Sequence, residues 1–202
     1  MQSLGGGTGS GLGSLLQSKL NEEYCTKTMK TYAVMPSWRE SEAETNVYNT
    51  MLSIGPHIEN GQLSVLFDNA ALYGICKEQL QIVEPTYADL NRVMAADMAA
   101  VTSNLRFAGP YATDLRQMNV NLVPFPRLHF CISGVAPLRH DTSSLEALSV
   151  PEITTRLFNW KNMMFTVESQ KELRLLTSIV TYRGAAVSSM ESETALLNIK
   201  TT

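Results

Sequence analysis

The chain has 202 residues, of which 44% are hydrophobic and 17% are charged, and its formal net charge at pH 7 is -3. This length is sufficient for one large hydrophobic core or two modest ones, and the recurrence of apolar residues along the chain excludes extensive disorder. A weakly acidic chain has no basic field with which to bind nucleic acid or anionic lipid, and no apolar run approaches the roughly 20 residues of a membrane span. We therefore expect neither nucleic acid nor a membrane among its partners.

The three cysteines, Cys25, Cys76 and Cys131, are far apart and include no C-x-x-C pair. Cysteines scattered in this way are typical of reduced, buried thiols in a cytoplasmic protein. The three histidines likewise lack the spacing of metal ligands. We expect no disulfide and no metal site built from these residues.

A glycine-rich segment, Gly5–Gly11, opens the first half of the chain. Leucines follow it at helical spacing, at Leu12, Leu15, Leu16 and Leu20. This spacing predicts an amphipathic helix to about Glu23. Thr28–Met35 is typical of a strand and ends at a proline. A polar loop then leads to a predicted helix whose apolar residues are Val47, Tyr48, Met51 and Leu52. A second strand is predicted over Leu63–Phe67, and Asp68 is a suitable cap for a further helix.

The longest helical pattern extends from Asp89, its expected cap, to about Leu105. Strands and helices alternate up to this point, which predicts an α/β fold in which helices cover a parallel sheet. The strand that should precede the glycine-rich segment is missing. We therefore expect an N-terminal portion to be absent from this chain.

The character of the sequence changes after a stiff Pro-Phe-Pro linker that begins at Pro124. Arg127–Ile132 predicts a strand. Ser149 is a good helix cap, because a proline and a glutamate follow it at the positions that favour a helix start. Leu173–Tyr182 predicts another strand, and Glu191–Ile199 predicts a final helix.

Consecutive glycines let backbone N–H groups approach a ligand without a Cβ in the way. At the start of the following helix these N–H groups lack intrahelical acceptors, and the helix dipole adds positive potential. Both features favour a phosphate group, and Thr8 and Ser10 can add hydroxyl donors. The dinucleotide motif would require glycine at Leu12 or Ser14, and the mononucleotide loop would require a Gly-Lys pair that this segment lacks. An NAD enzyme and a P-loop enzyme are therefore disfavoured, and the alternative is a glycine-rich leader without a ligand.

A series of motifs in this sequence resembles those of the tubulin family, most closely the beta type. The motifs keep the family's order over nearly the whole chain, and they are Gly5–Gly11, Asp68–Tyr73, Pro85–Asn91, Leu105–Phe107, Asn121–Phe130, Ala136–Leu138, Val150–Glu152 and Lys161–Met164. The resemblance implies a partial Rossmann-like GTPase domain with a parallel sheet and a long central helix, followed by an α/β second domain with a mixed sheet. The implied boundaries are residues 1–106 for the GTP-binding domain, 107–126 for a linker and interdimer loop, and 127–202 for a truncated second domain.

The resemblance also implies a nucleotide site for GTP, with Mg²⁺ in the complete protein. It assigns the phosphates to Ser3, Gly6, Gly7, Thr8, Gly9 and Ser10. Asn69 and Asn91 match the two amides that read the guanine or the sugar, and Tyr87 matches the ring that stacks on the base. An amide offers paired donor and acceptor atoms, and the face of an aromatic ring suits a flat purine.

In tubulins the nucleotide is hydrolysed after two subunits stack, and the resemblance places the stretch that reaches the neighbouring nucleotide at Gly109–Gln117. Family members usually carry Asn where Ala112 stands, and Glu (alpha type) or Lys (beta type) where Gln117 stands. Glutamine can orient water but cannot act as a base near neutral pH. We therefore assign no catalytic residue and expect no activation of hydrolysis on a neighbour. Asp114 is retained, and a helix cap is its simplest interpretation.

As a whole, the resemblance implies a structural subunit that assembles head-to-tail with an alpha-tubulin-like subunit and other tubulins in cytoplasmic microtubules. Some contact segments depart from the family pattern: Asn46 replaces a ribose-contacting acid, and the lateral-contact loop Arg139–Ala147 lacks its usual residues. The first strand, another phosphate loop and the C-terminal helices are also expected to be absent. Two alternatives stay open. One is a truncated remnant that neither binds GTP nor assembles, and the other is an independent α/β nucleotide-binding enzyme, for which we find no catalytic set.

Overall fold

The computed structural model describes residues 1–37, 43–107, 109, 113–138, 148–167, 175–184 and 187–201. Two sequence-based expectations lie outside these residues, namely the departure at Ala112 and the altered lateral-contact loop Arg139–Ala147. Within the described ranges, no helix combines the length and the apolar character that crossing a membrane requires.

The strands form one parallel sheet. β1 (Gln2–Ser3), β2 (Lys30–Met35), β3 (Leu63–Asp68) and β4 (Phe130–Ile132) lie in the order β1-β2-β3-β4. Strand order follows chain order, so each connection moves one strand along the sheet. The predicted α/β class with a parallel sheet is confirmed.

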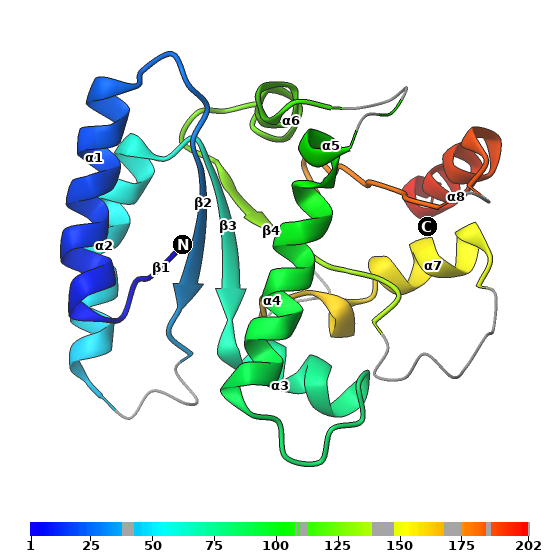
Figure 1. Ribbon diagram of the computed structural model, residues 1–202, viewed down its shortest axis with the longest axis horizontal. Helices are drawn as coiled ribbons and strands as arrows, with labels where there is room; N and C mark the ends of the chain where they lie inside the picture. Colours follow the sequence, from blue (N-terminus) through cyan, green and yellow to red (C-terminus); the bar gives the residue numbers. More distant parts are fainter. Residues whose placement is uncertain are drawn as a thin grey trace.

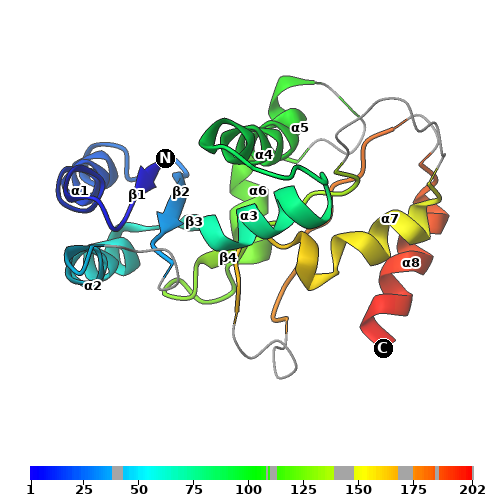
Figure 2. The same cartoon turned by 90° about the horizontal axis from the view of Figure 1, so that it is seen from below.

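Helices surround this sheet on both faces and extend away from it beyond β4. They are the π-helical turn η1 (Thr8–Leu12), α1 (Gly13–Glu23), α2 (Thr45–Asn60), α3 (Asn69–Glu78), α4 (Tyr87–Val101), α5 (Ser103–Arg106), α6 (Leu115–Leu122), α7 (Val150–Leu157), the 3-10 turn η2 (Trp160–Asn162) and α8 (Ser189–Thr201). In Figures 1 and 2, α1 and α2 lie side by side at the β1 end of the molecule, and α7 and α8 lie at the other end. Seen from below in Figure 2, α4 and α2 lie on opposite sides of the sheet.

The main core lies between the sheet and the helices α3 and α4. Its sheet side includes Tyr32, Val65 and Phe67, and Tyr32 stands opposite Val65 across the β2–β3 pair. The helices contribute Leu72, Ile75, Cys76, Leu90, Val93 and Met94 to it, and Met164 packs there as well. These helical residues recur three or four positions apart, which is the spacing that brings side chains to one face of a helix.

Local signals at helix starts are mostly confirmed. The Asp68 carboxylate accepts a hydrogen bond from the Ala70 N–H at 3.1 Å and so caps α3. Ser149 caps α7 in a reciprocal capping box with Glu152. The prediction for the long helix is wrong in one respect: Thr86 is the cap of α4, and Asp89 is its capping-box partner three residues later. A threonine hydroxyl and a carboxylate three residues apart satisfy each other in this arrangement.

The apolar faces predicted for the first two helices do not pack into the core. The leucines of η1 and α1 and the four apolar residues named for α2 are exposed: Leu12, Leu15, Leu16, Leu20, Val47, Tyr48, Met51 and Leu52. The inner faces are polar, with Ser14 and Gln17 of α1 and Thr50, Ser53 and His57 of α2 buried. Periodicity finds the two faces of a helix, but the tertiary contacts of η1 with β1 and of α1 with α2 decide which face is inside.

Four further expectations differ from the structure. A short strand, β1, lies directly before the glycine-rich segment and pairs with β2, although the sequence indicated no strand there. The strand predicted from Arg127 is shorter, and β4 joins the first sheet beside β3 rather than starting a separate mixed sheet. The described part of the predicted strand Leu173–Tyr182, from residue 175 onward, is not a strand. Cys25 is exposed instead of buried, although Cys76 is buried and all three cysteines are free thiols.

Candidate nucleotide site

The glycine segment is anchored on both sides of its bend. Leu4 is fully buried at the end of β1, and its N–H donates to the Val34 carbonyl at 3.0 Å. On the other side, Asn49 of α2 donates its side-chain N–H to the Gly5 carbonyl at 3.0 Å. The bend is therefore fixed by β2 and α2, and it delivers the following residues directly into η1.

The start of η1 is exposed and has no side-chain cap. Gly7 is the residue before the helix, with φ -59° and ψ -43°, and no side chain caps the helix there. The first N–H groups of a helix have no intrahelical acceptor. A Cβ added at Gly6 or Gly7 would meet no atom within 4 Å, and Gly6, Gly7 and Thr8 are exposed. An exposed, uncapped helix start of this kind is the type of backbone site that favours a phosphate group.

The other predicted phosphate residues have structural contacts. A Cβ at Gly9 would collide with the carbonyl oxygen of Ser3, so Gly9 allows η1 to lie against β1. Ser10 is buried, and its hydroxyl donates to the Gly7 carbonyl at 3.3 Å. Its N–H donates to the Gly6 carbonyl at 2.9 Å. Ser10 therefore stabilises the turn from its buried side, and Gly6, Gly7 and Thr8 are exposed.

The residues predicted to read the base stand at the same edge of the sheet. Asn69 begins α3 directly after β3, Tyr87 begins α4, and Asn91 follows one turn later on α4. The carboxyl ends of parallel strands meet at one edge, and Figure 1 shows η1 and the starts of α3 and α4 along that lower edge. Tyr87 is 71% exposed and meets Tyr73 edge-on, with ring centroids 6.5 Å apart. The fold thus brings the two groups of predicted residues to one side of the molecule.

The glycine turn does not fit a magnesium ion by itself. Mg²⁺ is held by carboxylates and phosphate oxygens, and the first acidic residue of the chain is Glu22, at the far end of α1. In the part of the chain that the structure describes, no three His, Cys, Asp or Glu residues cluster as metal ligands.

Gln117, the position aligned by motif with the family's catalytic residue, has a helix-capping role. Asp114 and Gln117 form a capping box at the start of α6, in which the Asp114 N–H donates to Gln117 Oε1 at 3.4 Å. The interpretation of Asp114 as a helix cap is confirmed. Gln117 is exposed, so its amide remains accessible from outside the molecule.

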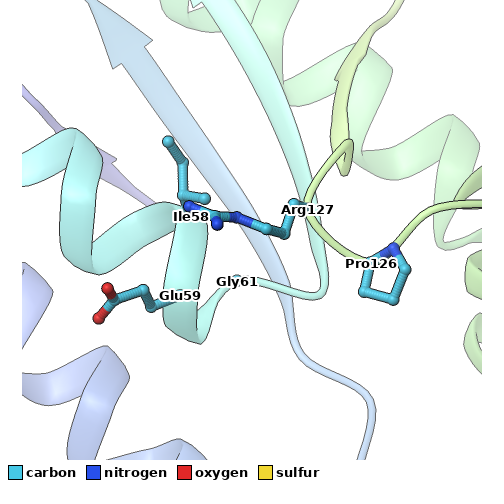
Figure 3. Close-up of a pocket in the computed structure, with 5 residues that line it drawn as sticks. All are labelled: Ile58, Glu59, Gly61, Pro126 and Arg127. Carbon is cyan, nitrogen blue, oxygen red and sulfur yellow. The ribbon is translucent and has the colours of Figure 1, made fainter.

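A cavity of about 330 Å³ lies at the opposite, amino edge of the sheet. It is lined by Ile58, Glu59, Gly61, Pro126 and Arg127, and in Figure 3 the Arg127 side chain reaches across towards the end of α2. None of the predicted nucleotide residues lines it. The glycine turn and the described cavity are thus at different ends of the strands.

Sequence reasoning assigned no role to His57, which lies next to this cavity. The structure buries it almost completely, and its Nε2 lies 2.6 Å from the Gln2 side-chain nitrogen. Burial, together with the neighbouring His129, lowers the pKa of His57, so its ring is neutral near pH 7. No local sequence signal marks this contact, because it joins β1 to α2 across 55 residues.

Two family models match the chain, and both describe tubulins. Residues 1–77 match the GTPase domain of the Tubulin/FtsZ family, and residues 126–202 match the Tubulin C-terminal domain. The whole chain is 44% identical to the Tubulin beta-6 chain of Gallus gallus, of which it covers 45%. Over 200 residues it is 45% identical to the Tubulin beta-3 chain of Oomycete-like sp. (strain MacKay2000), of which it covers 44%.

The chain belongs to the tubulin family. The resemblance read from the motifs, including its closeness to the beta type, is confirmed. The chain spans less than half the length of these two tubulins. The glycine turn and the starts of β3 and α3 fall within the GTPase match, whereas Tyr87 and Asn91 lie between the two matched regions.

Proposed function

We propose that this tubulin is a GTP-binding structural subunit of the beta-tubulin type. The N–H groups at the start of η1, from Gly6 to Thr8, hold the phosphates. Asn69 and Asn91 read the guanine or the sugar, and Tyr87 stacks on the base. The observation that carries the proposal is the uncapped helix start at Gly7, with open space at Gly6 and Gly7, in a chain that matches a GTPase family.

The electrostatics of this end of the molecule support an anionic ligand held by the backbone. Residues 1–18 contain no charged side chain, so within this segment no carboxylate repels a phosphate and no lysine competes with the amides. The favourable potential comes from the helix start, which carries about half a positive charge. Such a site binds a phosphate group by geometry as much as by charge.

The subunit is proposed to assemble in the cytoplasm, head-to-tail with an alpha-tubulin-like partner and with other tubulins in a microtubule. Contacts that repeat head-to-tail without closing build open filaments, and the nucleotide lies at such a contact. Magnesium accompanies GTP in the complete protein. Gln117 leaves the neighbouring nucleotide without a general base, so this subunit does not promote its hydrolysis.

Replacing Gly7 with Val tests the phosphate cradle. The introduced valine side chain would project into the space where the phosphate binds, without a clash within the chain. We expect GTP affinity to fall at least tenfold, about 1.4 kcal/mol, as measured by displacement of a fluorescent GTP analogue. Gly11→Val is the matched control, because Gly11 is equally open but lies outside the predicted contacts.

Equal affinities of the two variants, or a wild-type chain that binds ATP as well as GTP, would contradict this site. Co-sedimentation with microtubules tests assembly separately. A chain that binds GTP but stays in the supernatant would retain the nucleotide site and disprove the structural role. A chain that neither binds GTP nor sediments with microtubules would be the truncated remnant, which is one of the two alternatives from the sequence analysis.

A further inference from the structure

A carboxyl group is buried where the central helix α4 meets the sheet. Asp97 is only 2% exposed, and its Oδ2 has no hydrogen-bond partner among the described residues. It occupies an inward position of α4, one turn after Met94 and two turns after Leu90, both of which belong to the main core. A charged residue is rarely buried in this way without a direct partner.

The groups that face Asp97 come from β2 and from the segment after β4. β2 supplies Lys30 and Tyr32, the segment after β4 supplies Ser133, and Cys131 of β4 interacts with Lys30. Lys30 Nζ lies 5.1 Å from the centre of the Tyr32 ring, and that ring stacks on Phe67 at 5.8 Å. Tyr32 is buried, and its hydroxyl also has no partner in the described structure. Asp97 is the only carboxylate among the groups named here.

These surroundings disfavour charge on Asp97. Burial raises its pKa to about 6, although the Ser133 hydrogen bond and the Lys30 charge act in the opposite direction. Burial and Asp97 together raise the pKa of Tyr32 to about 12, and burial lowers the pKa of Lys30. Asp97 is therefore neutral in mild acid and ionised above neutrality.

We propose that Asp97 makes the docking of α4 on the sheet proton-dependent, firm while the carboxyl group is neutral and looser once it is ionised. A neutral carboxyl group fits the buried contact at little cost. The ionised group has one oxygen without a donor, and only Lys30 compensates its charge. Because its pKa is raised on folding, the stabilisation is complete below the unfolded value of about 3.9 and is lost as the pH rises through about 6.

Hydrogen exchange of the 202-residue chain tests this proposal, and it requires no nucleotide. Protection of the α4 amides between Leu90 and Met98 is compared with protection of α7 in the same sample, after correction for the intrinsic exchange rates. Between pH 5 and pH 7.5 we expect the α4 protection to fall about tenfold relative to α7, from the two pKa values in linkage. Asp97→Asn should abolish this fall, and Glu193→Gln, which changes an exposed carboxylate on α8, should leave it intact.

The wild-type measurement decides the proposal even if Asp97→Asn does not fold. A constant ratio between α4 and α7 at the two pH values would overturn it. An equal loss of protection in both helices would also overturn it, because Asp97 would then act on the whole fold and not on the docking of α4. The same fall in Asp97→Asn as in the wild type would assign the effect to another group.

Discussion

At the scale of single residues, the glycines of the first turn differ in ways that the sequence does not reveal. The sequence presents Gly7 and Gly9 as equivalent members of one phosphate loop. In the structure Gly9 is required for close packing of η1 against Ser3, whereas Gly7 faces open space. A substitution at Gly9 would therefore disturb the fold as well as any ligand. The position that tests phosphate binding is Gly7.

Tyr87 gives a residue-scale prediction for the base-reading part of the site. Its ring is mostly exposed and forms a T-shaped contact with Tyr73, so much of its surface is available for a purine. Stacking of a base on an aromatic ring contributes about 1–3 kcal/mol. We expect Tyr87→Ala to weaken GTP binding about tenfold while the far-UV circular dichroism spectrum stays unchanged.

Tyr24 supplies the control for this substitution. It is another exposed tyrosine, at the end of α1 and therefore away from the glycine turn. Tyr24→Ala should leave the affinity for GTP unchanged. Equal losses in both variants would show that the effect of Tyr87→Ala is not specific to a base.

At the scale of helices and strands, the sequence predicts what local chemistry decides. The caps Asp68 and Ser149 were predictable, because each interacts with residues within three positions along the chain. The inner face of α1 was not predictable in this way. Its buried side is polar, and its leucines are exposed, because α1 packs on α2, whose residues are far away in sequence.

The polar interface between α1 and α2 leads to a prediction for stability. Gln17 is 6% exposed, and neither atom of its amide has a partner in the described structure. An unsatisfied buried amide costs about 1–3 kcal/mol. Gln17→Met keeps the shape and removes this cost, so we expect the free energy of unfolding in urea to rise by about 1 kcal/mol.

Gln79→Met is the matched control, since Gln79 is exposed at the end of α3. The same substitution there should change the unfolding free energy by less than about 0.5 kcal/mol. A loss of stability in Gln17→Met would mean that the amide has partners, such as bound water, in solution.

At the scale of the whole molecule, the motifs predicted more than the periodicity did. The α/β class and the tubulin family followed from the order of short motifs over the chain, and both are confirmed. The joining of β4 to β3 was missed, because a parallel pair between residues 64–66 and 130–132 leaves no local signal. The candidate nucleotide site divides in the same way: the motifs predict its residue types, whereas the exposure and contacts of those residues depend on packing.

The last prediction concerns GTP hydrolysis between two assembled molecules, and it is tested at Gln117. Glu can replace Gln in the capping box with Asp114, so Gln117→Glu should keep the start of α6 intact. The new carboxylate would be exposed as Gln117 is, and it would supply the base that glutamine lacks. A positioned general base contributes at least about a hundredfold, so we expect that increase in GTP hydrolysis in filaments formed with an alpha-tubulin-like partner. Gln79→Glu adds the same charge on α3 and should leave the rate unchanged. If phosphate release is equally slow in both variants, the start of α6 does not face the neighbouring nucleotide.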